Sequence, residues 1–152
     1  MSETPYGERV EALRVEFGRR YGTPPEMVVR APGRVNLIGE HTDYNDGYVF
    51  PIAIDRSVLV AASPRQDRMV RLWAVDFDAQ VRFSLDSIAH DEKNKWSNYQ
   101  RGVAVVLQEQ GFDLCGVDMA MSSNVPIAAG LSSSAAIEVG TAGMWQTLCG
   151  FE

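Results

Sequence analysis

The chain has 152 residues, of which 45% are hydrophobic and 22% are charged, and its formal net charge is −6 at pH 7. These values are typical of a folded globular domain and exclude a disordered or fibrous chain. Basic residues are interspersed with acidic ones and form no continuous tract, which argues against nucleic-acid binding and favours a small-molecule partner.

The N-terminal part of the chain is predicted to form one helix and two short strands. Thr4-Pro5 is typical of a helix start, and apolar residues recur at helical spacing until Gly22. Two short apolar runs, 27–29 and 35–38, then predict strands that Pro32-Gly33 separates. The second run leads directly into a group of polar side chains.

A turn signal and a further strand follow this polar group. Asn45-Asp46-Gly47 favours a turn, and residues 48–54 are strand-like. Because Pro51 in this segment cannot donate a backbone hydrogen bond, we expect it at a sheet edge or at a bulge.

The remaining sequence is predicted to add four strands and two helices. In chain order these are strands 57–62, 69–75 and 79–85, a helix over 96–107 that ends at Gly111, a strand over 114–121, and a helix that starts within 132–136 and runs to about 148. A succession of strands with few intervening helices predicts an α+β fold whose sheet is mixed or mostly antiparallel and packed with helices. The chain stops directly after the last helix, as a truncated domain would.

The polar group at 40–44 is the first candidate for chemistry. Glu40, His41, Thr42 and Asp43 all donate or accept hydrogen bonds, and the hydroxyls of a sugar do both. Carboxylates there would accept hydrogen bonds from vicinal sugar hydroxyls. Each buried carboxylate–hydroxyl pair would disfavour an epimer, because the epimer would leave one partner unsatisfied. The alternative is a turn-stabilising network in which these side chains bond to nearby backbone. The residues alone leave both interpretations open.

The second candidate is VPIAAGLSSSAA, residues 125–136. A predicted loop with Gly130 leads into a helix that Ser132, Ser133 and Ser134 open. Helix N-termini favour phosphate, glycine permits close approach of the backbone, and serine hydroxyls can contact phosphate or magnesium. The alternative is ordinary helix capping. The common P-loop is excluded, because no Gly-Lys-Ser/Thr follows the glycine.

Together the two stretches resemble the GHMP kinase superfamily, and within it the galactokinases. GRVNLIGEHTDYNDG, residues 33–47, is similar to the galactokinase signature, and PIAAGLSSSAA, residues 126–136, is similar to the phosphate-binding motif of the superfamily. WSNYQRGVAVVL, residues 96–107, resembles the helix that lies between them in galactokinases. The resemblance extends over essentially the whole chain.

This resemblance implies a fold and a reaction. Residues 1–152 would form a partial N-terminal GHMP kinase domain of the ribosomal protein S5 domain 2-like kind. Its sugar-binding signature would lie in 31–47 and its phosphate-binding loop in 125–136, with the C-terminal domain absent. The reaction would transfer the γ-phosphate of ATP, bound with Mg²⁺, to the anomeric hydroxyl of galactose, the first committed step of galactose catabolism.

The resemblance also implies roles for individual residues. Arg34 would stabilise the charge that develops on the transferring phosphoryl group. The sugar hydroxyls would be held by Glu40, His41, Thr42 and Asp43. The magnesium ion would be bound by Ser134. The ATP phosphates would be cradled by seven consecutive residues, namely Ala128, Ala129, Gly130, Leu131, Ser132, Ser133 and Ser134.

Other positions limit the roles that the resemblance implies. In the family Trp96 would lie toward the nucleotide base, although its spacing equally predicts core packing. At Ala74 the family often has a nucleotide-contacting serine, so that contact is not expected here. The catalytic aspartate of the family, in a Gly-x-x-Asp-Gln segment, and the glutamate of its magnesium site are not found, and neither Asp118 nor Glu138 lies in the matching motif. We therefore expect the chain by itself to be inactive, and marginally stable or prone to aggregate through uncovered sheet faces.

Two alternative functions remain open. One is a non-catalytic regulator that binds galactose and ATP, and the other is a kinase for N-acetylgalactosamine or arabinose. The intact serine stretch favours an enzyme over a regulator, whereas the residues around the EHTD run discriminate only weakly between sugars.

The compartment is predicted from the N-terminus and the cysteines. The first residues contain no apolar stretch of the secretory type, and no apolar run is long enough to cross a bilayer. Cys115 and Cys149 match no metal-ligand spacing and are interpreted as reduced, partly buried thiols. These features predict a cytoplasmic protein without membrane contact.

Overall fold

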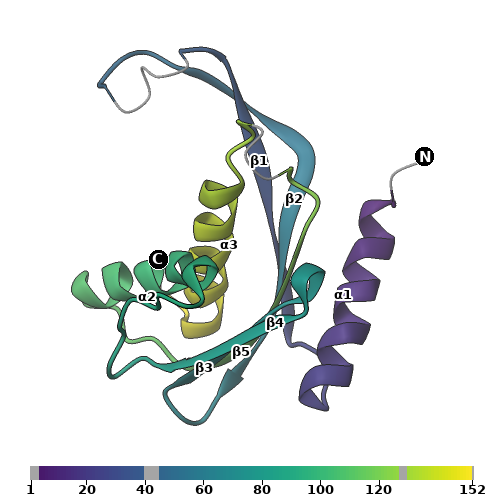
Figure 1. The fold of residues 1–152 in the computed structure, drawn as a ribbon, viewed down its shortest axis with the longest axis vertical. Coiled ribbons are helices and arrows are strands. Elements are labelled where there is room, and N and C mark those ends of the chain that lie inside the picture. The colour runs from purple at the N-terminus through teal and green to yellow at the C-terminus, as the bar shows by residue number, and fades with distance from the viewer. Residues whose placement is uncertain (1–3, 40–44, 127–129, 152) are drawn as a thin grey trace.

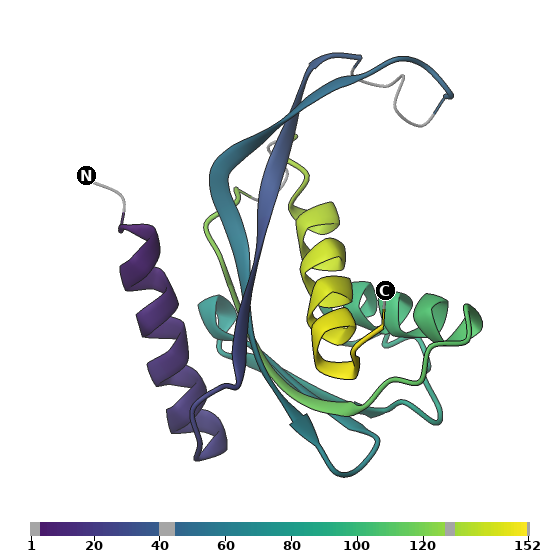
Figure 2. The same cartoon turned by 180° about the vertical axis from the view of Figure 1, so that it is seen from behind.

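A five-stranded sheet separates one helix from two others in the computed structural model, which describes residues 4–39, 45–126 and 130–151 (Figures 1 and 2). The elements in chain order are α1 (Tyr6–Tyr21), β1 (Met27–Ile38), β2 (Phe50–Arg65), β3 (Met69–Ala74), the 3₁₀ helix η1 (Val75–Phe77), β4 (Ala79–Ser84), the 3₁₀ helix η2 (Lys95–Ser97), α2 (Asn98–Glu109), β5 (Gly116–Ser123) and α3 (Ser133–Cys149). The strand order is β1-β2-β5-β3-β4, in which β3 and β5 are parallel and the other neighbours antiparallel. The predicted α+β class with a mixed sheet is confirmed.

The prediction of separate short strands around Pro32 and Pro51 is wrong, because two long strands form instead. β1 runs through Pro32 with a shift in its pairing register between Pro32 and Arg34. β2 joins the predicted strands 48–54 and 57–62, and only from Val58 onward does it also pair with β5. Pro51 therefore lies where β2 has β1 as its partner, beside a second register shift, as expected for a proline in a sheet.

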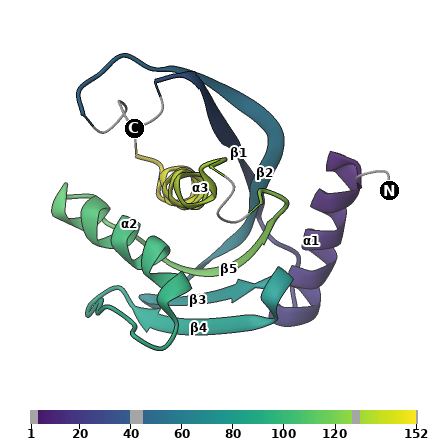
Figure 3. The same ribbon diagram turned by 45° about the horizontal axis from the view of Figure 1, so that its top comes forward.

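Helix α1 lies on one side of the sheet and α2 and α3 lie on the other (Figure 3), and a different set of side chains is buried on each face. In β2, residues alternate between the faces, so that Leu59 and Ala61 lie toward α1 whereas Val58 and Val60 lie toward α2 and α3. The predicted apolar stripe of the first helix is confirmed, because Leu13 and Phe17 of α1 are fully buried against this face. The larger core lies on the other face, under α2 and α3, and includes Trp145.

Helix α3 lies close to β1 and β2 at Gly140. A Cβ added at Gly140 would lie 3.2 Å from Val60 Cγ2 and 3.3 Å from Ala31 Cβ. These distances are tighter than ordinary van der Waals contacts, so a larger side chain would force the helix away from β1 and β2. Glycine at position 140 is thus favoured by the close packing of α3 on the two strands.

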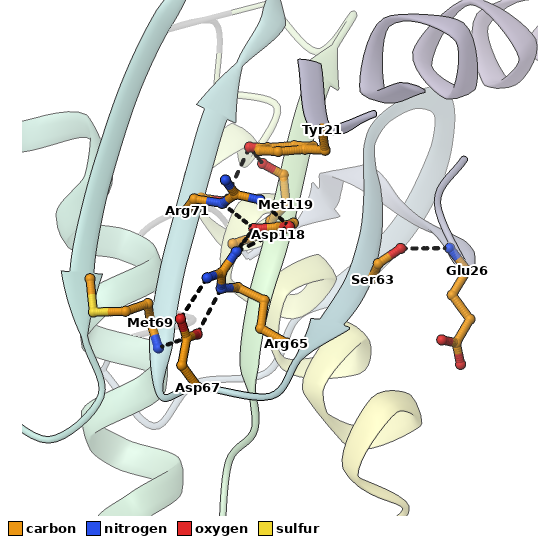
Figure 4. Close-up of polar contacts among 9 residues, drawn as sticks. All are labelled: Tyr21, Glu26, Ser63, Arg65, Asp67, Met69, Arg71, Asp118 and Met119. Carbon is orange, nitrogen blue, oxygen red and sulfur yellow. Dashed lines mark hydrogen bonds and ion pairs between the residues drawn. The ribbon is translucent and has the colours of Figure 1, made fainter. Parts of the chain in front are cut away.

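A polar cluster ties α1 to the middle of the sheet (Figure 4). The Asp118 carboxylate accepts hydrogen bonds from Arg71 Nε and Nη2, both at 2.5 Å, and from Arg65 Nη1 at 3.1 Å. Arg65 also pairs with Asp67, whose pKa it lowers to about 2. The Tyr21 hydroxyl donates to Met119 O at 3.0 Å, and burial raises the pKa of Tyr21 to about 12. Asp118 is therefore an ion-pair residue that links β5 to β3 and β2.

Candidate functional site

The end of β1 and the loop before α3 are joined by a backbone contact. The Arg34 N–H donates to Leu131 O at 3.1 Å. A Cβ added at the neighbouring Gly33 would lie 2.9 Å from the same oxygen, a distance that real Cβ atoms essentially never show. Gly33 therefore permits the two segments to touch, and the two candidate motifs of the sequence meet at this point.

The loop turns into α3 through two residues with left-handed backbone. Gly130 has φ 70° and Ser132 has φ 57°, a conformation that costs a non-glycine residue about 1 kcal/mol or more. No atom lies within 4 Å of a Cβ added at Gly130, so glycine is favoured there by its φ angle rather than by crowding. Ser132 is the N-cap of α3, yet its side chain makes no capping hydrogen bond. The interpretation of Ser132 as an ordinary side-chain cap is thus wrong.

A mainly apolar pocket of about 310 Å³ lies beside the first turn of α3. Ser133 and Ser134 line one side of it. The apolar side chains around it come from several elements and include Phe77 of η1, Trp96 of η2, Met121 of β5 and Ile137 of α3. The arrangement can hold a flat apolar group beside a polar, hydroxyl-bearing helix terminus.

Trp96 lies between the larger core and this pocket. The side chain is half-buried and packs against the larger core, and it also lines this pocket. Ala74 lines the pocket as well, with no hydroxyl at the position where the resemblance would place a serine.

Asp76 lies at the same pocket and is held in place by β5. Its carboxylate accepts hydrogen bonds from Ser122 Oγ at 2.9 Å and from Ser123 N at 2.7 Å. This carboxylate fixes η1 against the end of β5, which lies directly before the loop that leads to α3. Sequence reasoning missed Asp76 and Gly33, because each acts through a contact with a segment distant along the chain.

The predicted site residues fall into two groups. Arg34 is half-buried on β1, and Gly130, Leu131, Ser132, Ser133 and Ser134 lie where β1 meets α3. The other predicted residues lie outside the described part of the chain, and they are Glu40, His41, Thr42, Asp43, Ala128 and Ala129.

No group of three or more His, Cys, Asp or Glu side chains that could hold a metal ion is found in the described ranges. A magnesium ion usually takes few protein ligands and several from water or phosphate. The serine hydroxyls beside the pocket suit such an ion, with the remaining ligands supplied by phosphate. In the described part of the chain, no helix has the length and hydropathy needed to span a bilayer.

The fold and the sequence of the second part of the chain match a known class of kinases. Residues 98–152, which include α2, β5 and α3, match the GHMP kinases N terminal domain. The solved structure of mevalonate kinase from Methanococcus jannaschii has the same fold, with a TM-score of 0.70 over 83% of this chain and 41% of that one, at 24% identity. The chain belongs to the GHMP kinases.

Within this class the chain belongs to the galactokinase family. Residues 15–64 match the galactokinase galactose-binding signature. A galactokinase from Roseiflexus sp. (strain RS-1) is 55% identical over 136 residues, which are 90% of this chain and 34% of that protein. The structure of Lactococcus lactis galactokinase complexed with galactose matches with a TM-score of 0.86 and 35% identity, over 95% of this chain and 38% of that one. The chain thus spans about a third of the length of the curated relatives it matches.

Proposed function

We propose that this chain supplies the sugar-binding and phosphate-binding parts of a galactokinase, which transfers the γ-phosphate of ATP to the anomeric hydroxyl of galactose. The observation that carries the proposal is the hydrogen bond from Arg34 N to Leu131 O, because it fixes the galactose-binding signature against the loop of the GHMP motif. A kinase needs its two substrates at one place, with the acceptor hydroxyl in line with the γ-phosphate.

The sugar is assigned to Glu40, His41, Thr42 and Asp43, directly after the end of β1. Their carboxylates, imidazole and hydroxyl provide donors and acceptors for several sugar hydroxyls at once. The similar Lactococcus lactis protein was solved with galactose bound, and the signature that matches here is named for galactose binding.

The nucleotide is assigned to the pocket and to the loop 128–134. The N-terminus of α3 carries partial positive charge from the helix dipole, and Ser133 and Ser134 add hydroxyls beside it. The apolar side chains around the pocket would receive the base. Mg²⁺, bound to Ser134 and to phosphate, would neutralise charge on the phosphates when present.

Arg34 is assigned the electrostatic role in phosphoryl transfer. Its backbone is hydrogen-bonded to the proposed phosphate-binding loop, so its side chain extends from the place where the two substrates would meet. A positive charge at this junction favours the negative charge that develops on the transferring group. A residue that activates the acceptor hydroxyl is not assigned within this sequence, so we expect the 152-residue chain to bind both substrates without turnover.

The experiment is a calorimetric titration of the purified chain with galactose and, separately, with MgATP. Asp43→Ala should lower the affinity for galactose at least about tenfold and leave the affinity for MgATP unchanged, because one charged hydrogen-bond partner of the sugar is lost. Asp55→Ala, which removes an exposed carboxylate of β2, is the matched control and should bind both ligands normally.

Three outcomes would count against the proposal. Unchanged galactose affinity in Asp43→Ala would remove the sugar role of Asp43. Tighter binding of arabinose or N-acetylgalactosamine than of galactose would overturn the substrate. Sugar phosphorylation by the 152-residue chain alone would show that the acceptor-activating residue lies within this sequence.

A further inference from the structure

The two cysteines of the chain lie side by side, although 34 positions separate them in sequence. Cys115 directly precedes β5, and Cys149 is the last residue of α3. Both thiols are free and half-buried, and their sulfur atoms are 3.3 Å apart. The Cys115 N–H also points to Cys149 Sγ, at 3.3 Å.

This proximity is imposed by the surrounding structure. The buried Trp145 indole N–H donates to Cys115 O at 3.2 Å, which fixes the last turn of α3 against the start of β5. Phe112 and Phe151, which flank the cysteines on the two segments, stack with ring centroids 4.3 Å apart. Two independent contacts therefore hold the segments together on either side of the thiols.

The sulfur atoms are close enough to bond after a small movement. A disulfide bond is about 2.05 Å long, so the two sulfurs must approach by about 1.2 Å. Cys149 lies at a helix end beside Gly150, and Cys115 lies outside any helix or strand, so both can adjust without breaking the sheet pairing.

We propose that Cys115 and Cys149 form a reversible intramolecular disulfide in which the oxidant is a low-molecular-weight disulfide of the glutathione type. The thiolate of Cys149 attacks one sulfur of the oxidant and releases one glutathione thiolate. Cys115 then attacks the sulfur of Cys149, loses its proton, and releases the second glutathione. The two protein thiols give up two electrons and two protons, and one oxidised glutathione becomes two reduced molecules.

The order of the two thiols follows from their surroundings. Burial, together with the neighbouring Cys149, raises the pKa of Cys115 to about 12. Burial therefore disfavours the Cys115 thiolate, and we assign the first attack to Cys149.

The disulfide would stabilise the domain without blocking the proposed substrate site. It would close a covalent loop over residues 115–149, which contains β5 and α3. The serines of the proposed phosphate site lie at the opposite end of the 17-residue helix α3, about 25 Å away. The inference therefore stands independently of the proposed function.

The test is to incubate the reduced chain with excess oxidised glutathione and to measure thiols, mass and Tm. We expect both thiols to disappear, the monomer mass to fall by about 2 Da, and Tm to rise by about 5–10 °C, with full reversal by dithiothreitol. Cys149→Ser and Cys115→Ser are the matched controls, and neither should show the mass loss or the rise in Tm.

Specific results would overturn the inference. They are two thiols that persist in the folded protein, a stable glutathione adduct on one cysteine, and a disulfide that links two chains on a non-reducing gel. An intramolecular disulfide with unchanged Tm would overturn the stabilising effect.

Discussion

At the scale of single residues, the junction between the two motifs depends on a missing side chain. Gly33 leaves room for Leu131 O at a distance where a Cβ cannot fit, and its negative φ means that crowding, rather than backbone conformation, selects glycine. Arg34 keeps its backbone contact with the loop only because this space is free. Gly33 therefore allows β1 to lie directly against the loop that precedes α3.

Gly33→Ala should destabilise the chain by about 1–3 kcal/mol, because the added methyl group must push the loop 130–132 away from β1. The matched control is Gly102→Ala in α2, where no atom lies within 4 Å of the new Cβ and alanine favours the helix by about 0.5–1 kcal/mol. Urea unfolding measures both free energies. Equal effects of the two substitutions would contradict the role of Gly33.

At the scale of secondary-structure elements, the cluster around Asp118 fixes how α1, β3 and β5 meet. Asp118 is a carboxylate with 14% side-chain exposure, and it pairs with both Arg65 and Arg71 (Figure 4). Removal of its charge leaves the guanidinium groups of Arg65 and Arg71 without the carboxylate that they share.

Asp118→Asn should therefore lower the free energy of unfolding by about 1–3 kcal/mol. Asp86→Asn is the matched control, since Asp86 also pairs with an arginine, Arg68, but its side chain is 64% exposed. Exposed pairs contribute about 1 kcal/mol or less, so the control should change stability little. Thermal and urea unfolding of the two variants check the comparison, and a larger loss in Asp86→Asn would refute it.

The elements also show which parts of the structure the sequence could predict. The apolar stripe of α1 and the predicted start of α3 agree with the structure. The stripe predicted for the second helix agrees only in part, because Tyr99 and Val106 are exposed and the buried residues of α2 are Gln100, Arg101 and Ala104. The continuity of β1 and β2 could not be predicted, because Pro32 and Pro51 act locally as strand breakers and are tolerated only through pairing with a distant segment. The candidate phosphate loop could be predicted from its serines, whereas Gly33 and Asp76 could not, since their partners are distant in sequence.

At the scale of the whole molecule, the far ends of β1 and β2 project beyond the helices (Figure 1). Apolar side chains in and beside these strand ends are exposed. The exposed fraction is 72% for Ile38, 100% for Tyr48 and 63% for Phe50. Apolar residues gathered in this way favour association with another surface. The expected tendency of the chain to aggregate stays a prediction, and this hairpin is where we expect contacts to begin.

The stability of the whole chain should depend on alkaline pH through Tyr21. Burial raises its pKa to about 12, above the ordinary value of about 10, so the folded state favours the protonated phenol. The stabilisation is complete below about pH 10 and is lost as the pH rises toward 12. Tm measured against pH should therefore fall more steeply in the native sequence than in Tyr21→Phe, which has no proton to lose.

Parallel curves for the two proteins would contradict this prediction. Titration of the tyrosinate absorbance gives a second check. Tyr21→Phe should lose the phenol that ionises near pH 12.

The position of β5 between β2 and β3 has a consequence for how the chain assembles. β2 and β3 are consecutive in sequence but do not pair with each other. They become part of one sheet only when β5, residues 116–123, pairs with both. The β1–β2 and β3–β4 hairpins are local and can form early, whereas β5 must arrive from about 50 residues further along the chain. During synthesis, β2 and β3 therefore each have one unpaired edge until β5 has been made and pairs with both. In this interval we expect the nascent chain to be most prone to incorrect strand pairing.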